Sequence, residues 1–158
     1  DDHRRAVPGL ALYGASPMPG KTGADLGFRP ALKLESRLLA VRTYDAGSVI
    51  GYGAAYTCVE RMPIGVVAVG YADGIPRCIP NGTPVRVRGR AAPVAGRVSM
   101  DMITVDLRGI PDAQVGDPVL IFGEALPAEI IAAHAGTIAY ELFCGLTNRV
   151  RFQYLGGN

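Results

Sequence analysis

The stretch PIGVVAVG, residues 63–70, is an unbroken apolar run, and a run of this length favours a strand that is buried on both faces. Apolar and polar residues alternate before it in LKLE at 32–35, and after it in VRVR at 85–88 and VSMDMITVDL at 98–107. Alternation with a period of two is typical of strands that turn one face to the core. We therefore expect several short strands within residues 31–123.

Turn signals separate these segments at Gly47, Asn81-Gly82, Gly89 and Gly116-Asp117, where tight turns are expected. The 21 glycines and 12 prolines among 158 residues favour many short elements over long helices. Short strands at this spacing predict an all-β, mainly β class with a compact antiparallel barrel or sandwich.

The pattern changes after residue 123. Two short helices are predicted near the C-terminus, over residues 128–135 and 138–146, with Gly136 between them. Residues 150–154, VRFQY, alternate again and are predicted to return to the sheet.

Composition excludes several classes of protein. Only 19% of residues are charged and the net charge is +2, which excludes a strongly basic nucleic-acid binder and an acidic disordered chain. No apolar run reaches the roughly 18 residues that span a membrane. Three dispersed cysteines, Cys58, Cys78 and Cys144, indicate free thiols and a cytoplasmic location. The start, DDHRRAVPG, has no initiator Met, so we expect a cut or added end there.

The residues offer no covalent or metal catalyst. The two histidines, His3 and His134, belong to no cluster with metal-ligand spacing. The two lysines, Lys21 and Lys33, lie in a predicted linker and on a predicted solvent-facing strand. Neither is expected to be a desolvated amine suited to a Schiff base.

Four weaker signals point to a site. Tyr52 lies between two glycines, which expose its phenol, although a phenol acts as acid or base only with a lowered pKa or a very basic partner. The segment 71–77, YADGIPR, is a turn after a buried strand, where side chains often meet ligands. Arg97 and Asp101 could pair or line a polar channel, and Tyr140 lies in a predicted helix. Each has a structural alternative: a rim tyrosine, an ordinary turn, a surface ion pair or a packed helix face.

The order of the motifs is more specific than any one of them. They are PGLALYGASP (8–17), GYGAAY (51–56), VGYADGIPR (69–77), GRVSMDM (96–102) and GTIAYEL (136–142). Together they resemble the C-terminal domain of bacterial alanine racemases, preceded by the end of that family's barrel. The resemblance implies an end-of-barrel segment and linker at 1–28 and a C-terminal β domain at 29–158.

The resemblance also implies a function. Alanine racemases interconvert L- and D-alanine, which supplies D-alanine for peptidoglycan. They use pyridoxal 5'-phosphate held by a lysine of an N-terminal (β/α)8 barrel. In their head-to-tail homodimers, the β domain of one subunit completes the partner's active site. The barrel is thus the implied partner and alanine the implied substrate. Because the barrel and its lysine are missing here, we expect the isolated chain to be inactive.

Individual positions match the family's functional residues. Tyr52 matches the tyrosine that exchanges the substrate Cα proton on one face, the barrel lysine serving the other. Met100 matches a residue whose backbone helps to hold the substrate carboxylate. Tyr140, Gly9 and Leu10 match contacts to the cofactor phosphate, and Tyr140 also shapes the substrate entrance. Five further positions match the lining of the substrate-access corridor: Tyr71, Arg77, Arg97, Asp101 and Ile138.

One position departs from the family. Two residues before Gly9 the family carries an arginine that faces the pyridine nitrogen, whereas this chain has Val7, with Arg4 and Arg5 out of register. The departure suggests that residues 1–7 are foreign sequence or that the barrel portion is degenerate.

Two alternatives stay open. The first is a stand-alone β module for binding or dimerisation, in which Arg86, Arg88 and Arg90 contact an anionic partner. The second is a pyridoxal-phosphate enzyme for another substrate, such as a serine, lysine or broad amino-acid racemase, or a decarboxylase. Tyr52 argues against a decarboxylase, which needs no second base at Cα.

Overall fold

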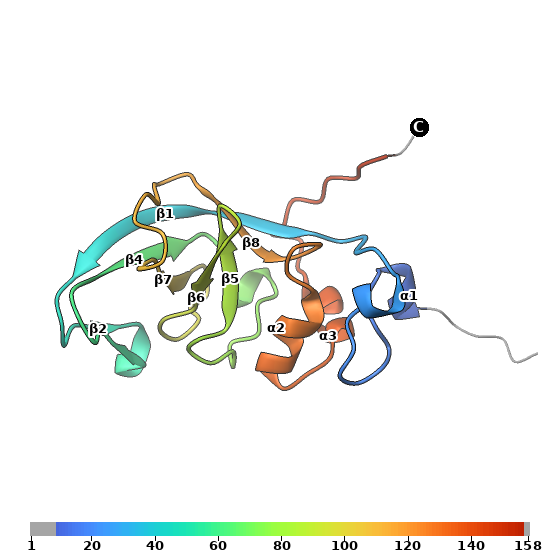
Figure 1. The fold of residues 1–158 in the computed structure, drawn as a ribbon, viewed down its shortest axis with the longest axis horizontal. Helices are drawn as coiled ribbons and strands as arrows, with labels where there is room; N and C mark the ends of the chain where they lie inside the picture. Colours follow the sequence, from blue (N-terminus) through green and yellow to red (C-terminus); the bar gives the residue numbers. More distant parts are fainter. Residues whose placement is uncertain (1–8, 157–158) are drawn as a thin grey trace, which may run out of the picture.

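A six-stranded antiparallel sheet forms the body of the protein (Figure 1). The computed structural model describes residues 9–156, so the departure at Val7 and the expectations for residues 1–7 lie outside the described residues. The strands follow the order β6-β5-β8-β1-β4-β7. Their bounds are β1 (Leu34–Tyr44), β4 (Met62–Val67), β5 (Pro84–Val87), β6 (Arg90–Pro93), β7 (Ile103–Asp106) and β8 (Pro118–Phe122).

The sheet closes almost completely on itself. Its two end strands, β6 and β7, meet through an antiparallel bridge between Val94 and Val105. Strand β1 pairs with β8 near its start and with β4 towards its end, with register shifts after Leu34 and after Leu38. Such irregularities bend a strand and help a sheet to curve. The predicted all-β, barrel-like fold is therefore confirmed.

The core lies inside this curved sheet. Val85 and Val87 of β5 are buried, whereas Arg86 between them is only half-buried, as the alternating pattern predicts. In strand β4, a Cβ added to Gly65 would lie 2.8 Å from Leu38 Cδ2. Four of the six residues of β4 are buried and the other two, Pro63 and Val66, are half-buried, which agrees with the buried strand predicted from the apolar run.

A small hairpin projects from the sheet. Strands β2 (Val49–Ile50) and β3 (Tyr56–Thr57) pair antiparallel, and the 3-10 turn η2 (Tyr52–Ala54) joins them. Two further 3-10 turns are η1 (Ala24–Leu26) and η3 (Tyr71–Asp73). The predicted turn glycines Gly47, Gly82, Gly89 and Gly116 all adopt left-handed φ values, of 83°, 89°, 79° and 91°.

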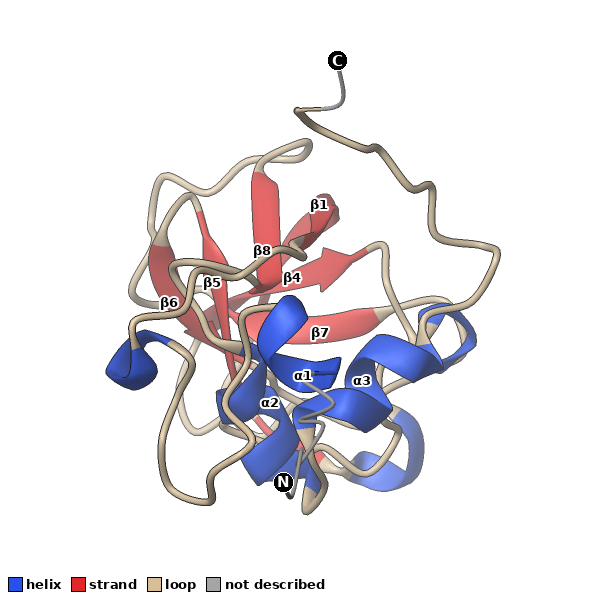
Figure 2. Cartoon of the chain, turned by 90° about the vertical axis from the view of Figure 1, so that its right-hand side faces the viewer, coloured by secondary structure: helices blue, strands red, loops and turns tan. Residues whose placement is uncertain are grey.

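Three short helices gather at the opposite end of the molecule from this hairpin (Figures 1 and 2). They are α1 (Gly9–Leu12), α2 (Ala128–Ala135) and α3 (Ala139–Gly145). The two C-terminal helices confirm the prediction, and α1 forms within the motif at 8–17, for which no helix was predicted. The ring of Phe143 packs against that of Phe122 in β8, with centroids 5.9 Å apart, which ties α3 to the sheet.

Two strand predictions are wrong. Residues 150–154 form no strand, and Phe152 and Tyr154 are exposed. A strand needs an edge to pair with, but the bridge between Val94 and Val105 joins the two outer strands of the sheet. The strand expected over 98–107 is confined to β7, since residues 99–102 fold into a turn.

Candidate functional site

Tyr52 lies at the tip of the β2–β3 hairpin, and the residue is 71% exposed. We call residues 51–55 the Tyr52 tip. The second phenol of the motif, Tyr56, is half-buried and donates a hydrogen bond to Met62 Sδ at 3.7 Å. Burial raises the pKa of Tyr56. Of these two phenols, only that of Tyr52 is presented to solvent.

The Tyr52 tip borders two grooves. One, of about 410 Å³, is lined by Tyr52 and Arg97 together with Ser99 and Met102. The other, of about 530 Å³, is lined by Arg97 and Arg77. Within residues 9–156 neither arginine forms an ion pair. The structure thus brings three predicted site residues together, with two cations suited to attract a carboxylate.

A compact turn at residues 99–102, here the Met100 turn, forms the next wall of the first groove. The Ser99 hydroxyl donates to Met102 O at 2.8 Å, and Met102 N donates to Ser99 Oγ at 3.1 Å. The carbonyl of Met100 accepts a hydrogen bond from Ala72 N at 3.0 Å. Among the described residues, the N–H of Met100 has no acceptor, so it is available to a ligand.

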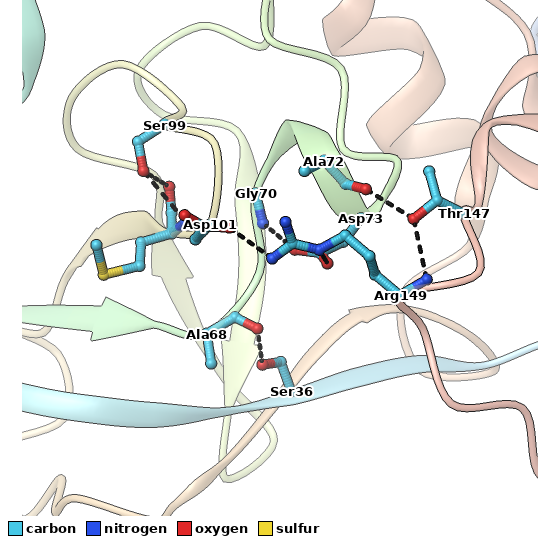
Figure 3. Close-up of polar contacts among 10 residues, drawn as sticks. Ser36, Ala68, Gly70, Ala72, Asp73, Ser99, Asp101, Thr147 and Arg149 are labelled. Carbon is cyan, nitrogen blue, oxygen red and sulfur yellow. Dashed lines mark hydrogen bonds and ion pairs between the residues drawn. The ribbon is translucent and has the colours of Figure 1, made fainter.

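Ion pairs hold the Met100 turn against η3. Figure 3 shows Arg149 reaching between Asp73 and Asp101. Arg149 Nε lies 3.1 Å from Asp73 Oδ1, and Arg149 Nη2 lies 2.5 Å from Asp101 Oδ1. The hydrogen bond to Asp101 raises the pKa of Arg149. The pair considered between Arg97 and Asp101 is therefore replaced by one between Asp101 and Arg149.

Tyr71 opens η3, beside the Met100 turn, and its side chain is 44% exposed. Its backbone N–H donates to Ser99 O at 3.0 Å. The backbones approach so closely here that a Cβ on Gly70 would lie 2.3 Å from Met100 O. Tyr71, Met100 and Asp101 are thus fixed side by side, as expected for residues of one site.

The remaining predicted residues form a second group at the helical end. A Cβ on Gly9 would lie 1.9 Å from Tyr140 Oη, so the phenol closes directly over the start of α1. Leu10 is buried, whereas Ile138 and Tyr140 are exposed, and the three line one groove of about 410 Å³. Only glycine leaves room at position 9 for the phenol, and the result is a small cradle of backbone N–H groups and one hydroxyl.

These two groups do not meet within the chain. The grooves that contain Tyr52 and Tyr140 share no lining residue. The Tyr52 tip and the helices lie towards opposite ends of the long axis (Figure 1). One chain therefore presents two separate groups of the predicted site residues.

Sequence reasoning missed the residues that hold the site together. Asp73 was interpreted as part of an Asp-Gly turn, and its Oδ2 in fact accepts from Gly70 N at 2.9 Å. Arg149, directly before the strand predicted over 150–154, was given no role of its own. Asn81 was interpreted only as a turn signal, yet its side chain bonds two other loops. Only the contact of Asp73 with Gly70 is local; the contacts of Asp73 with Arg149 and of Asn81 with Ala55 and Gly96 join residues that are distant in sequence.

Other expectations can be compared with the structure. The basic strand is largely neutralised, since Arg88 and Arg90 each pair with Asp112 at 2.9 Å. Across residues 9–156, no group of three His, Cys, Asp or Glu side chains is placed to hold a metal ion. No helix in this part of the chain has the length and apolar character to cross a membrane.

Known proteins match this chain along most of its length. A family model described as "Alanine racemase, C-terminal domain" matches residues 31–154. Alanine racemase of Aliivibrio salmonicida is 54% identical over 148 residues, which are 94% of this chain and 41% of that protein. That of Pectobacterium carotovorum is 52% identical over 158 residues, with 98% of this chain and 43% of that protein covered. The chain thus spans about two fifths of the length of these curated relatives.

Solved structures agree with the sequence matches. Biosynthetic alanine racemase from Pseudomonas aeruginosa superposes with a TM-score of 0.89 at 45% identity, covering 92% of this chain and 41% of that one. Alanine racemase from Bartonella henselae, described with covalently bound pyridoxal phosphate, gives a TM-score of 0.80 at 31% identity over 89% of this chain and 39% of that one. On the match over residues 31–154 and these identities, the chain belongs to the alanine racemase C-terminal domain family.

Proposed function

We propose that this chain is part of an enzyme that interconverts L- and D-alanine. The observation that carries the proposal is the exposed phenol of Tyr52 beside a groove that also meets Arg97 and the Met100 turn. A proton-transfer group next to donors for a carboxylate is what reaction at an amino-acid Cα requires. Membership of the family supports alanine as the substrate.

Each residue at the groove has a distinct role in this proposal. The Tyr52 hydroxyl moves a proton to or from the substrate Cα on one face, while a barrel lysine serves the other face. The Met100 N–H donates to the substrate carboxylate. Arg77, Arg97, Tyr71 and Asp101 line the corridor by which the substrate reaches these groups. Two opposed proton carriers are needed because inversion returns the proton to the face opposite the one it left.

Pyridoxal 5'-phosphate is the cofactor in this proposal, and it supplies the electron-withdrawing ring that acidifies the Cα–H bond. The cradle at Gly9 fits its phosphate group. The backbone N–H groups of Gly9 and Leu10 and the hydroxyl of Tyr140 offer donors to one small anion. A side chain at position 9 would collide with the Tyr140 hydroxyl, which supports a role for this glycine. Ile138 lines the groove beside Tyr140.

The separation of the two groups supports a shared active site. A chain that presents Tyr52 and Tyr140 in grooves without common lining fits a head-to-tail dimer in which Tyr140 serves the chain's own (β/α)8 barrel and Tyr52 serves the partner's. In this proposal residues 1–28 complete the barrel and lead to the β domain at 29–158. The isolated chain is inactive, because the cofactor lysine belongs to the barrel.

Subunit complementation tests this proposal on the full-length enzyme. One subunit carries Tyr52→Phe, and the other carries the barrel's cofactor lysine changed to alanine. Each homodimer is expected to be inactive in an assay for D-alanine formed from L-alanine. After the two are mixed and allowed to exchange subunits, activity should return, because one site of the mixed dimer has both proton carriers. Activity of either homodimer before mixing contradicts the shared site. A lack of activity after subunit exchange has been demonstrated contradicts it as well. A wild-type enzyme that does not racemise alanine contradicts the proposed substrate.

A further inference from the structure

The Tyr52 tip has little structure of its own to hold it. Two residues of each strand are paired, and backbone hydrogen bonds of Gly47 and Ser48 with Cys58 extend the ladder at the end away from the tip. Short two-stranded hairpins of this kind are marginally stable. Within the tip, Gly53 and Ala54 adopt left-handed φ values of 69° and 51°. A left-handed backbone costs a residue with a Cβ, such as Ala54, about 1–2 kcal/mol. The conformation of the tip therefore depends on contacts from outside the hairpin.

Asn81 supplies such a contact with both ends of its side-chain amide. Its Nδ2 donates to Ala55 O at 2.6 Å, and its Oδ1 accepts from Gly96 N at 2.7 Å. Ala55 is the last residue of the tip, and Gly96 precedes Arg97 in the groove wall. One neutral side chain thus ties the tip to the wall that it faces.

The loop that carries Asn81 is a firm anchor. Gly82 N donates to Val94 O at 2.8 Å, and Val94 N donates to Thr83 O at 2.8 Å. Thr83 is fully buried. The groove wall is fixed in turn, because Ala95 N donates to Thr104 O at 2.9 Å. A shift of the tip is therefore resisted by the barrel through Asn81.

The first residue of the tip meets the same wall. A Cβ on Gly51 would lie 2.9 Å from Arg97 N, so the two backbones are in close contact there. The tip is held at both ends against residues 96–97, by contact at Gly51 and by hydrogen bonds at Ala55. Among the described residues, the Tyr52 side chain has no hydrogen-bond partner of its own, so its place depends on these two attachments.

We propose that Asn81 is a positioning residue that fixes Tyr52 for proton transfer. The inference rests on the proposed role of Tyr52. Proton transfer requires close, aligned atoms, and a displacement of about 1 Å can cost on the order of 10²-fold in rate. Asn81 also lines the groove of Arg77 and Arg97, but both polar ends of its side chain are bonded to backbone atoms. Its loss should therefore slow the step that uses Tyr52 and leave substrate binding nearly unchanged.

The test uses Asn81→Ala in the full-length enzyme. We expect kcat to fall roughly 10–100-fold in both directions, with KM within about twofold. Alanine deuterated at Cα separates positioning from general damage. The isotope effect should rise for the enantiomer whose Cα hydrogen faces Tyr52 and fall for the other, because only the Tyr52 step becomes slower.

A second variant and a control sharpen the result. Asn81→Asp keeps an acceptor for Gly96 but turns a carboxylate oxygen towards Ala55 O, so its loss of kcat should at least equal that of Asn81→Ala. Gln114→Ala removes another exposed amide, one whose side chain has no hydrogen bond within residues 9–156, and should match the wild type. Amide hydrogen exchange at residues 51–56 should be faster in both Asn81 variants.

Three outcomes would overturn the positioning role. One is a kcat of Asn81→Ala within twofold of the wild type, and another is unchanged hydrogen exchange at residues 51–56. The third is a loss of kcat with a lowered Tm and unchanged isotope effects, which would indicate a structural role only. A wild-type enzyme without alanine racemisation would contradict the proposed function instead, and faster exchange in the variants would still support the tie between Asn81 and the tip.

Discussion

The Tyr52 tip and the Met100 turn border the same groove, but they are held in different ways. The tip contains left-handed residues and is tied by one side chain, Asn81. The Met100 turn has its own Ser99 hydrogen bonds, two backbone hydrogen bonds to η3 and the pair between Arg149 and Asp101. The side-chain hydrogen bonds of the tip come from a single neutral amide, whereas the polar contacts of the turn are shared among several groups.

This difference predicts how the two functions respond to mutation. When a region is held by one contact, removal of that contact has its full effect on the position of the region. When several contacts hold a region, the remaining ones partly compensate for the loss of one. Proton transfer by Tyr52 should therefore be sensitive to single changes around the tip. Carboxylate binding at the Met100 turn should be disturbed strongly only when the backbone itself is displaced.

The largest expected effect comes from Tyr52→Phe, which removes the phenol oxygen and keeps the ring. A positioned acid or base contributes roughly 10²–10⁴-fold, so kcat should fall by that factor in both directions while KM stays nearly constant. Steady-state assays in both directions measure this. Tyr56→Phe is the matched control, since its hydroxyl only bonds Met62 Sδ. A comparable loss in the control, or a change mainly in KM, would remove the assignment of proton transfer to the tip.

A smaller effect is expected from Gly70→Ala, which changes the Met100 turn. The added Cβ would lie 2.3 Å from Met100 O and 2.4 Å from Ser99 O. Because these are backbone atoms, the Met100 turn must shift to relieve the clash. Overpacking of this kind costs about 1–3 kcal/mol, so KM should rise roughly tenfold and Tm should fall. Gly109→Ala, whose Cβ would meet nothing closer than 4.0 Å, should change neither. An unaltered KM in Gly70→Ala would show that the turn does not bind the substrate.

Much of the fold follows from local pattern. The alternation in 85–88 predicts β5, and the apolar run from residue 63 predicts β4. Each pattern depends only on which faces of the strand are buried. The alternation over 98–102 misleads, because the Ser99 hydroxyl bonds to the backbone of Met102 and offers a turn in place of a strand. Residues 150–154 mislead for another reason. A strand there would need a free sheet edge to pair with, and the two outer strands of the sheet are already bridged to each other.

The candidate site residues come from motifs, but their contacts do not. Tyr52 lines a groove together with Ser99 and Met102 of the turn that contains Met100. The partners of Asp101 and Asn81 were not predictable, because Arg149 and Ala55 are 48 and 26 positions away. Local spacing favoured Arg97 as the partner of Asp101, and only the fold brings Arg149 nearer.

A modest effect is expected from Arg149→Ala. The backbone hydrogen bonds of the Met100 turn limit the damage, and an exposed ion pair such as that with Asp101 contributes about 0.2–1 kcal/mol. KM should therefore rise about two- to fivefold with kcat nearly unchanged. Arg151→Ala, which removes the same charge from the same exposed segment, is the control. A fall in kcat with constant KM would show that Arg149 acts on the Tyr52 tip and would contradict the inference that it acts only on the Met100 turn.

Salt should give the smallest effect and the finest test of the difference. The side chains of Arg149 and Asp101 are 47% and 53% exposed, so their attraction weakens as the Debye length falls from about 30 Å at 0.01 M to about 3 Å at 1 M. KM of the wild type should rise by less than about twofold over that range, and by less still in Arg149→Ala, which has no pair to screen. The Asn81 tie is uncharged, so the isotope effects that report on Tyr52 should stay constant in both proteins. Isotope effects that change with salt would mean that charge also positions the tip, and the two regions would then share one mode of attachment.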